Sequence, residues 1–266
     1  MASLLPTRNR VVMSAAPVVP EPPKTLYIHV RCDSDLNDCL NQLWAVTTYA
    51  RNNNREIVLE MPRYTGDLLT IFDFAKYPVK VHTNASVIPA DAKRAPFNPE
   101  GKSMTQVLVH ESAGGGIQSA HVFRYVRLQP VLIESLKGLP ILHSAIHVAP
   151  TNPAHELINV DALVKEFVTS QRSRPVFLVT ENEPRQTQMV KKYGFCTRPV
   201  TSSSSSTPEP ILLMDAVFDL MVLMSAKDLL CVPGADNKVS GIAVLAKELQ
   251  PKRLFVRDLV LGKPMA

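Results

Sequence analysis

Hydrophobic and polar positions follow two spacings from residue 25 onward. Short apolar runs, typical of buried strands, occur at 26–30, 57–59, 79–82, 106–110, 141–148, 175–180, 229–232 and 253–256. Segments with apolar residues at helical spacing lie between most of them, at 37–52, 66–75, 119–137, 159–170, 184–192, 211–225 and 237–249. Strands that alternate with helices favour parallel sheets covered by helices on both faces. The predicted fold class is therefore α/β.

The Gly-Leu-Pro sequence at 138–140 interrupts this alternation after a long predicted helix. About eight strands in roughly 240 residues fit either one wide sheet or two smaller Rossmann-like halves. We predict two Rossmann-like domains that face a cleft, one at 25–138 and one at 139–266. Prolines in residues 1–24 exclude helical periodicity and predict a flexible N-terminal extension. The serine run at 202–206 predicts a flexible surface loop.

Composition narrows the class of protein without naming a function. A hydrophobic content of 45% and a mean hydropathy of +0.02 are typical of a soluble globular chain. The net charge of +5 allows an anionic partner, but no dense Lys/Arg stripe predicts nucleic-acid binding. No apolar stretch reaches the ~20 residues of a membrane span. Because the four cysteines form no CxxC pair, we expect reduced thiols, no zinc site and a cytoplasmic location.

The segment around the first predicted helix is the most informative. Asn37 and Asp38 begin that helix directly after the first strand and a short polar loop. In a Rossmann-like unit, this helix N-terminus lies at the carboxyl end of the strand, where unpaired backbone N–H groups attract anions. The segment therefore predicts a ligand site. The alternative is an ordinary Asn/Asp helix cap without a ligand.

Several motif matches lack the context that their chemistry requires. Asp33-Ser34-Asp35 spells the DxD of metal-dependent glycosyltransferases, but it follows the first strand rather than several strand–helix units, so we interpret it as a solvated loop. The three glycines at 114–116 are not followed by Gly-Lys-Ser/Thr and predict a turn. His29 and His143 lie on apolar strands and are interpreted as core or edge residues. The histidines and cysteines predict no metal site.

Segments spread over residues 26–260 share an order and spacing with the motifs of a known enzyme family. They lie at 35–43, 123–130, 146–148, 176–181, 219–232 and 237–240. The chain resembles the fucosyltransferases of the two-Rossmann-domain (GT-B) fold, of the Nod-factor type and its α1,6/α1,2 and protein O-fucosyltransferase relatives. The resemblance implies transfer of fucose or another hexose or pentose from a nucleotide-sugar to a glycan or protein acceptor, with no metal and no separate cofactor.

The resemblance also implies roles for individual residues. The nucleotide-sugar is expected to be held mainly by the second domain, with its diphosphate facing helix N-termini. Glu60 and Arg63, after the second strand, are expected to face the acceptor, with Glu60 as the candidate base. The expected donor-binding residues are Asn37, Asp38, His147, Thr180, Glu181, Asp219, Asn237, Lys238 and Ser240.

Three departures from the family pattern, together with the weakness of each single motif, keep two alternatives open. Both glycines of the first loop are replaced, by Asp35 and Asn37. Ala149 stands where the family has the arginine of His-x-Arg, which removes a bidentate phosphate clamp. Asp219 is one residue out of register with the serine that follows it. The first alternative is a catalytically inactive GT-B-like module that binds a glycan or nucleotide, and the second is an unrelated Rossmann-like nucleotide-binding protein.

Overall fold

The computed structural model describes residues 24–111, 118–140, 143–149, 160–171, 174–198, 211–234 and 238–250. Several sequence predictions lie outside these residues: the extension at 1–24 except for Lys24, the glycines at 114–116, the loop at 202–206, the strand at 253–256, and Asn237. Within the described part of the chain, no helix is long and apolar enough to cross a membrane.

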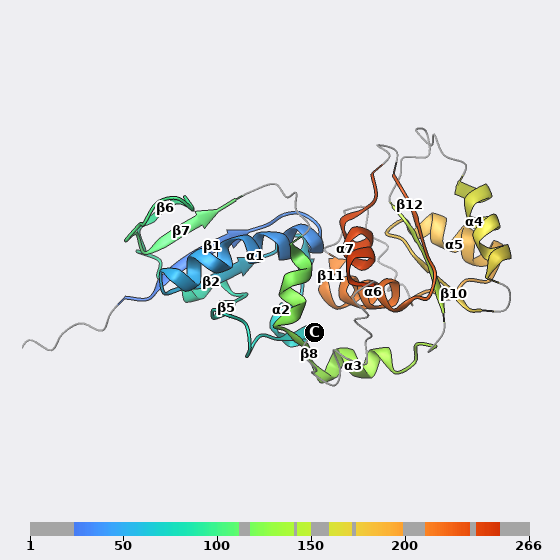
Figure 1. The fold of residues 1–266 in the computed structure, drawn as a ribbon, viewed down its shortest axis with the longest axis horizontal. Helices are drawn as coiled ribbons and strands as arrows, with labels where there is room; N and C mark the ends of the chain where they lie inside the picture. Colours follow the sequence, from blue (N-terminus) through green and yellow to red (C-terminus); the bar gives the residue numbers. More distant parts are fainter. Residues whose placement is uncertain are drawn as a thin grey trace, which may run out of the picture.

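The first half contains a five-stranded parallel sheet in the order β5-β2-β1-β7-β6 (Figure 1). Its strands are β1 (Leu26–Arg31), β2 (Arg55–Glu60), β5 (Val81–His82), β6 (Arg94–Pro96) and β7 (Val107–His110). Helix α1 (Leu36–Asn52) covers one face, where Leu40 and Leu43 are buried against Ile28 and Ile57. A segment that includes the short 3-10 helix η1 (Ala85–Val87) covers the other face.

The second half contains a three-stranded parallel sheet in the order β10-β9-β12. Its strands are β9 (Ser144–Val148), β10 (Val176–Val179) and β12 (Leu229–Val232). Helices α4 (Val160–Ser170) and α5 (Glu183–Tyr193) pack on the face that presents Ile146 and Val148. Helices α6 (Leu213–Ser225) and α7 (Gly241–Leu249) lie on the other face. The predicted α/β class with two Rossmann-like sheets is confirmed.

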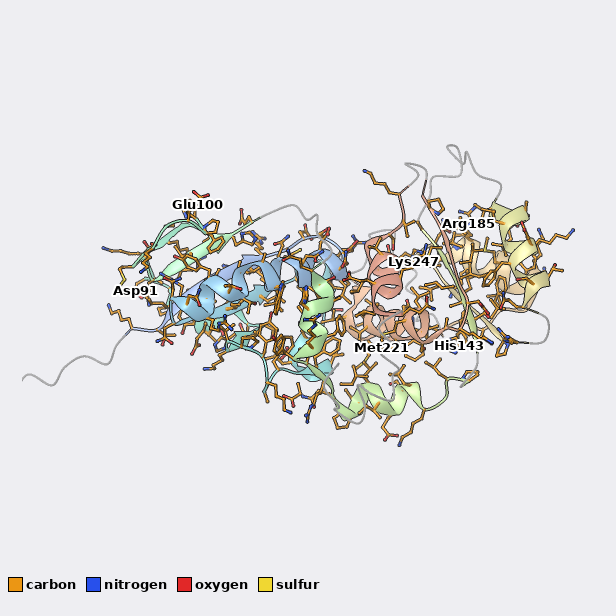
Figure 2. The ribbon with its side chains drawn as sticks, in the orientation of Figure 1. Asp91, Glu100, His143, Arg185, Met221 and Lys247 are labelled. Atoms are coloured by element: carbon orange, nitrogen blue, oxygen red, sulfur yellow. The ribbon has the colours of Figure 1, made fainter. Side chains whose placement is uncertain are left out.

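Helices α6 and α7 form a layer between the two sheets (Figure 1). Their apolar side chains belong to the same hydrophobic cluster as α1, so one core joins the two halves. Met221 of α6 is fully buried in this layer (Figure 2). The ring of His143, just before β9, contacts the carbonyl oxygen of Val222 in α6 at 3.0 Å, which confirms its prediction as a core residue. The domain limits at 138 and 139, between α3 (Pro130–Leu136) and β9, remain a prediction.

Two predicted helices differ from the structure. The segment 119–137 divides into the 3-10 helix η2 (Ser119–Arg124), the short strand β8 (Arg127–Leu128) and helix α3 (Pro130–Leu136). Pro130 explains the division, because a proline cannot donate an intrahelical bond and disfavours helical geometry in the residue before it. The segment 66–75 shortens to α2 (Leu68–Ile71), followed by β4 (Phe72–Asp73), which pairs with β8.

A second small sheet links the halves. Strand β3 (Tyr64–Thr65) of the first half pairs in parallel with β11 (Ile211–Leu212), which leads into α6 of the second. These strands have two residues each, which is too short for a periodic signal in the sequence.

Candidate functional site

The carboxyl ends of the two sheets meet beside helix α7. Strand β1 is central in the first sheet and β9 is central in the second. In open parallel sheets, ligands bind at the carboxyl ends of the strands where the strand order reverses, which is beside these central strands. Two contacts join the loops at these ends. The backbone N–H of Gly241 donates to Asp35 over 3.1 Å, and Arg63 Nη2 donates to Glu181 Oε2 over 3.2 Å.

The first contact involves Asp35, which the sequence placed in a solvated loop. Asp35 is instead the N-cap of α1, where its Oδ1 accepts a hydrogen bond from the backbone N–H of Asp38. Its other oxygen, Oδ2, accepts from Gly241 at the start of α7. Burial raises the pKa of Asp35, and the bonds from Asp38 and Gly241 partly offset that effect. One carboxylate therefore lies at the positive ends of two helices.

His147 and Ser240 form the second part of the site. His147 lies in β9, on the face of the sheet covered by α6 and α7, and only 3% of it is exposed. Its Nε2 is 3.1 Å from the hydroxyl of Ser240, the N-cap of α7, whose side chain makes no capping bond. Its Nδ1 has no hydrogen-bond partner in the described structure. Burial lowers the pKa of His147 to about 4, so the ring is neutral at pH 7.

An acidic pair on α6 forms the third part. Asp215 and Asp219 both pair with the guanidinium of Arg198, and Arg198 Nη2 lies 3.5 Å from Asp219 Oδ2. Burial raises the pKa of Asp219 to about 6, against the opposing effect of Arg198, and the charge of Glu181 raises it further. Asp219 therefore changes its protonation state close to neutral pH.

His147 and Asp219 are expected to affect stability in opposite directions on acidification. The pKa of His147 is lower in the folded state than in the unfolded state. Its contribution to the stability of the folded state is therefore complete above pH 6.5 and is lost as the pH falls toward 4. Asp219 has a higher pKa when folded, so the folded state gains stability as the pH falls from 6 toward 3.8. Each group is expected to change the free energy of unfolding by about 3 kcal/mol across its window.

The His147→Gln and Asp219→Asn variants separate these two effects. Compared with wild type, His147→Gln is expected to gain stability as the pH falls from 6.5 to 4, because the protonation penalty of the buried ring is gone. Asp219→Asn is expected to lose stability over the same range. Denaturant unfolding at a series of pH values measures both differences. Parallel pH curves for the wild type and both variants would contradict this assignment.

The remaining predicted site residues have varied surroundings. Asn37 is buried and accepts a hydrogen bond from the hydroxyl of Ser119, and Asp38 accepts one from Ser34. Thr180, at the end of β10, accepts a hydrogen bond from the backbone N–H of Asn182. Lys238 is exposed, and its carbonyl accepts from the N–H of Gly234. Asn37 and Asp38 thus bind other segments of the chain, while Thr180 directly follows β10 and Lys238 lies in the loop before α7.

The predicted acceptor-side residues follow β2. Glu60 Oε2 lies 2.9 Å from His29 Nε2 and 4.0 Å from Arg31 Nε. The other ring nitrogen of His29 has no partner in the described structure. Arg63 contacts Glu181, a predicted donor-side residue, so the structure joins one residue from each predicted side. Both side chains are more than a third exposed, so this pair contributes little stability by itself.

Sequence reasoning missed two functional candidates. Arg198 was not singled out, because it lies near no motif and reaches Asp215 and Asp219 only through the fold. The role of Gly241 was also missed. A Cβ atom at position 241 would overlap both carboxylate oxygens of Asp35, so only glycine allows this close approach. A glycine as the first residue of α7, directly after the Ser240 cap, was the sequence signal that could have indicated a close contact at this position.

Comparison with solved structures identifies the fold. The crystal structure of the fucosyltransferase NodZ from Bradyrhizobium matches with a TM-score of 0.61 and 15% identity, over 86% of this chain and 94% of that one. A structure of NodZ α-1,6-fucosyltransferase soaked with GDP-fucose matches over the same shares, with a TM-score of 0.59 and 16% identity. The chain has a fucosyltransferase-like fold. POFUT1 in complex with GDP-fucose matches with a TM-score of 0.50 and 13% identity, over 92% of this chain and 97% of that one.

Sequence comparison alone does not find this likeness. No protein-family model matches the chain, and no curated protein matches it. The solved structures confirm the predicted resemblance to fucosyltransferases of the GT-B fold at the level of the fold, although their sequence identity to this chain is only 13–16%.

Proposed function

We propose that the protein is a glycosyltransferase that moves fucose, or another hexose or pentose, from a nucleotide-sugar to a glycan or protein acceptor. The observation that carries the proposal is the N-terminus of α7, which lies with Ser240 and the buried His147 beside the central strand of the second sheet. This arrangement supplies backbone N–H groups, a hydroxyl and an imidazole to a diphosphate. The solved neighbours that contain GDP or GDP-fucose support a nucleotide-sugar as the donor.

The residues of the site suit the departure of a nucleoside diphosphate. As the bond from the sugar to the diphosphate breaks, negative charge grows on the phosphate oxygens. The N–H groups at the start of α7 stabilise that charge. His147 is neutral at pH 7, so it contributes a hydrogen bond and no charge. Ser240 and His147 lie 3.1 Å apart and can contact the same phosphate group.

Proton removal from the acceptor has two candidate groups. Glu60 is the candidate base predicted from the sequence, and its carboxylate is already oriented by His29. Asp219 is the other carboxyl group, since burial brings its pKa to about 6, close to the value that suits a base at neutral pH. Glu60→Gln and Asp219→Asn, compared by kcat at saturating donor, identify which group acts. The acting group is expected to lose about 10²- to 10⁴-fold in kcat.

Titration calorimetry against a panel of nucleotide-sugars tests the proposal. We expect one donor to bind and Ser240→Ala to weaken it, because a phosphate contact is lost. Thr83→Ala is a suitable control, since Thr83 donates to Asp67 beside helix α2. Equal donor affinity in wild type and Ser240→Ala would contradict the placement of the diphosphate. The cytoplasmic location remains part of the proposal and rests on the cysteine pattern.

The catalytically inactive binding module is the second candidate. The observation that favours it is the Asp35 carboxylate, which occupies the N-terminus of α7, together with Ala149 in place of an arginine. A module of this kind would bind a nucleotide-sugar and leave it intact. Prolonged incubation of the bound donor, with chromatography of the products, separates the two candidates.

Activity is expected to persist in EDTA. The described residues contain no group of three or more His, Cys, Asp or Glu side chains placed to hold a metal ion. In the proposal, helix N-termini stabilise the diphosphate charge, so no divalent ion is required. Donor turnover with and without EDTA measures this. Loss of turnover that Mn²⁺ restores would revive the metal-binding interpretation of Asp33 and Asp35, and Asp35→Ala would then be the next variant to examine.

A further inference from the structure

We infer that the Asp35 carboxylate is a built-in occupant of the phosphate position, and that the diphosphate of an incoming donor must displace it from the N-terminus of α7. This inference rests on the proposed function and describes how the same site is regulated.

The contacts of Asp35 are those of a bound anion. Its Oδ1 accepts from the N–H of Asp38 at 3.0 Å, and its Oδ2 accepts from the N–H of Gly241 at 3.1 Å. The first bond caps α1, which has 17 residues, and the second caps α7, which has nine. A carboxylate at these two positive ends satisfies the same backbone groups that would otherwise bind a phosphate.

Position 241 is shaped around this carboxylate. A Cβ atom on residue 241 would overlap both Asp35 oxygens, although the backbone of Gly241 needs no unusual conformation. The usual N-cap side chain of α7 does not compete with Asp35, because Ser240 makes no capping bond and contacts His147 instead. Asp35 therefore acts as the cap of α7 from 206 positions away in the chain.

A buried side chain beside this position has an incomplete set of hydrogen bonds. His147 is 97% buried, its Nε2 faces the Ser240 cap of α7, and its Nδ1 has no partner in the described structure. A buried imidazole nitrogen without a partner is unfavourable unless another group completes its hydrogen bonds. A phosphate at the start of α7 would lie beside the Ser240 and His147 pair.

The energetics favour exchange rather than coexistence. Two anions cannot share one helix N-terminus, since like charges at this distance repel. Burial already disfavours the charged form of Asp35, and the nearby Asp38 adds to this effect, whereas Arg63 opposes it. Release of the carboxylate toward solvent therefore returns part of the free energy of desolvation. Arg63, whose charge lowers the pKa of Asp35 and whose side chain is 38% exposed, is the cation that we expect to attract the released carboxylate.

Asp35→Asn and Asp35→Ser test the displacement. Asparagine and serine both cap α1 as well as aspartate does, but asparagine removes the charge and serine is too short to reach Gly241. With GDP as the probe in titration calorimetry, both variants are expected to bind about 10-fold to 100-fold more tightly than wild type. Inorganic pyrophosphate is expected to follow GDP. Guanosine, which has no phosphate, is expected to bind wild type and variants equally.

Asp67→Asn is the matched control, because Asp67 caps α2 through Leu69 in the same half of the chain. It is expected to leave the GDP affinity unchanged. If wild type binds GDP and the Asp35 variants bind no more tightly, the displacement inference is wrong and the proposed function stands. If neither wild type nor any variant binds GDP or a nucleotide-sugar at millimolar concentration, the proposed function and the displacement both fail.

A double-mutant cycle tests the contact itself without any ligand. Gly241→Ala is expected to lower the midpoint of thermal unfolding, because the new methyl group overlaps the Asp35 carboxylate. In the Asp35→Ser background, the same Gly241→Ala change is expected to be neutral or stabilising, since alanine is the better helix former. Equal effects of Gly241→Ala in both backgrounds would show that Asp35 does not hold α7 in solution.

Discussion

The Ala149→Arg variant is expected to bind a nucleotide-sugar roughly 10- to 100-fold more tightly than wild type. Residue 149 follows β9 and continues its pairing, with its N–H donating to the carbonyl of Val232 over 3.1 Å. Since side chains alternate along a strand, position 149 shares a face with His147, the face toward α7. An arginine there would supply a permanently charged, bidentate contact to the diphosphate, worth about 1.5–3 kcal/mol.

Titration calorimetry with GDP-fucose measures this effect, with Ala149→Met as the control for side-chain bulk at a buried position. The measurement is repeated with the double variant Asp35→Asn/Ala149→Arg. In the single variant, an Asp35 carboxylate that stays at the start of α7 would pair with the new guanidinium. If Ala149→Arg leaves the affinity unchanged while Lys238→Ala abolishes binding, the phosphate site has been rebuilt around the loop before α7. If neither substitution matters, the diphosphate does not bind at this edge.

The Arg55→Met variant is expected to lower the free energy of unfolding by about 3–5 kcal/mol. Arg55 is 2% exposed, and its guanidinium donates to the carbonyl oxygens of Tyr27, Ser103 and Thr105 at 2.6–3.0 Å. These bonds fix the start of β1 against the segment that leads into β7. Methionine fills most of the volume but leaves the three carbonyl groups without these bonds.

Urea unfolding followed by circular dichroism measures the loss. Arg94→Met is the matched control, because Arg94 begins the edge strand β6 and its side chain is exposed. The control is expected to change the free energy of unfolding by less than about 0.5 kcal/mol. A similar, small loss in both variants would show that the Arg55 hydrogen bonds are replaced by water in the folded protein.

Elements with a clear apolar pattern, which is helical spacing for α1 and a short apolar run for each strand, could be predicted from the sequence. Helix α1 and strands β1, β2 and β12 lie within two residues of their predicted limits, because each buries an apolar face whose spacing matches its geometry. Pro130 indicated a break in the helix predicted at 119–137. The apolar residues at helical spacing around it nevertheless suggested one continuous helix in place of β8 and α3. Strand β6 contains Arg94, Ala95 and Pro96, a composition that only an edge strand tolerates and that no pattern reveals.

The candidate site was predictable only in part. The ends of the strands predicted at 26–30 and 141–148 were expected to contribute to a ligand site, and the structure places the α1 cap and His147 at those ends. The role of Asp35 depends on Gly241, and the ion pairs of Asp219 depend on Arg198. These partners are distant in the chain and meet only after α6 and α7 pack between the sheets, so no local pattern reports them.

The release of free nucleotide from a nucleotide-sugar tests the central proposal most directly. Wild-type protein is incubated with an excess of each nucleotide-sugar of a panel that includes GDP-fucose. The released nucleoside diphosphate is quantified by chromatography, for long enough to detect many turnovers per protein molecule. We predict slow, saturable release from one donor, faster release in Asp35→Asn, and loss of release in Ser240→Ala. Binding of a donor without any release in wild type or Asp35→Asn would contradict the transferase and identify the protein as a binding module.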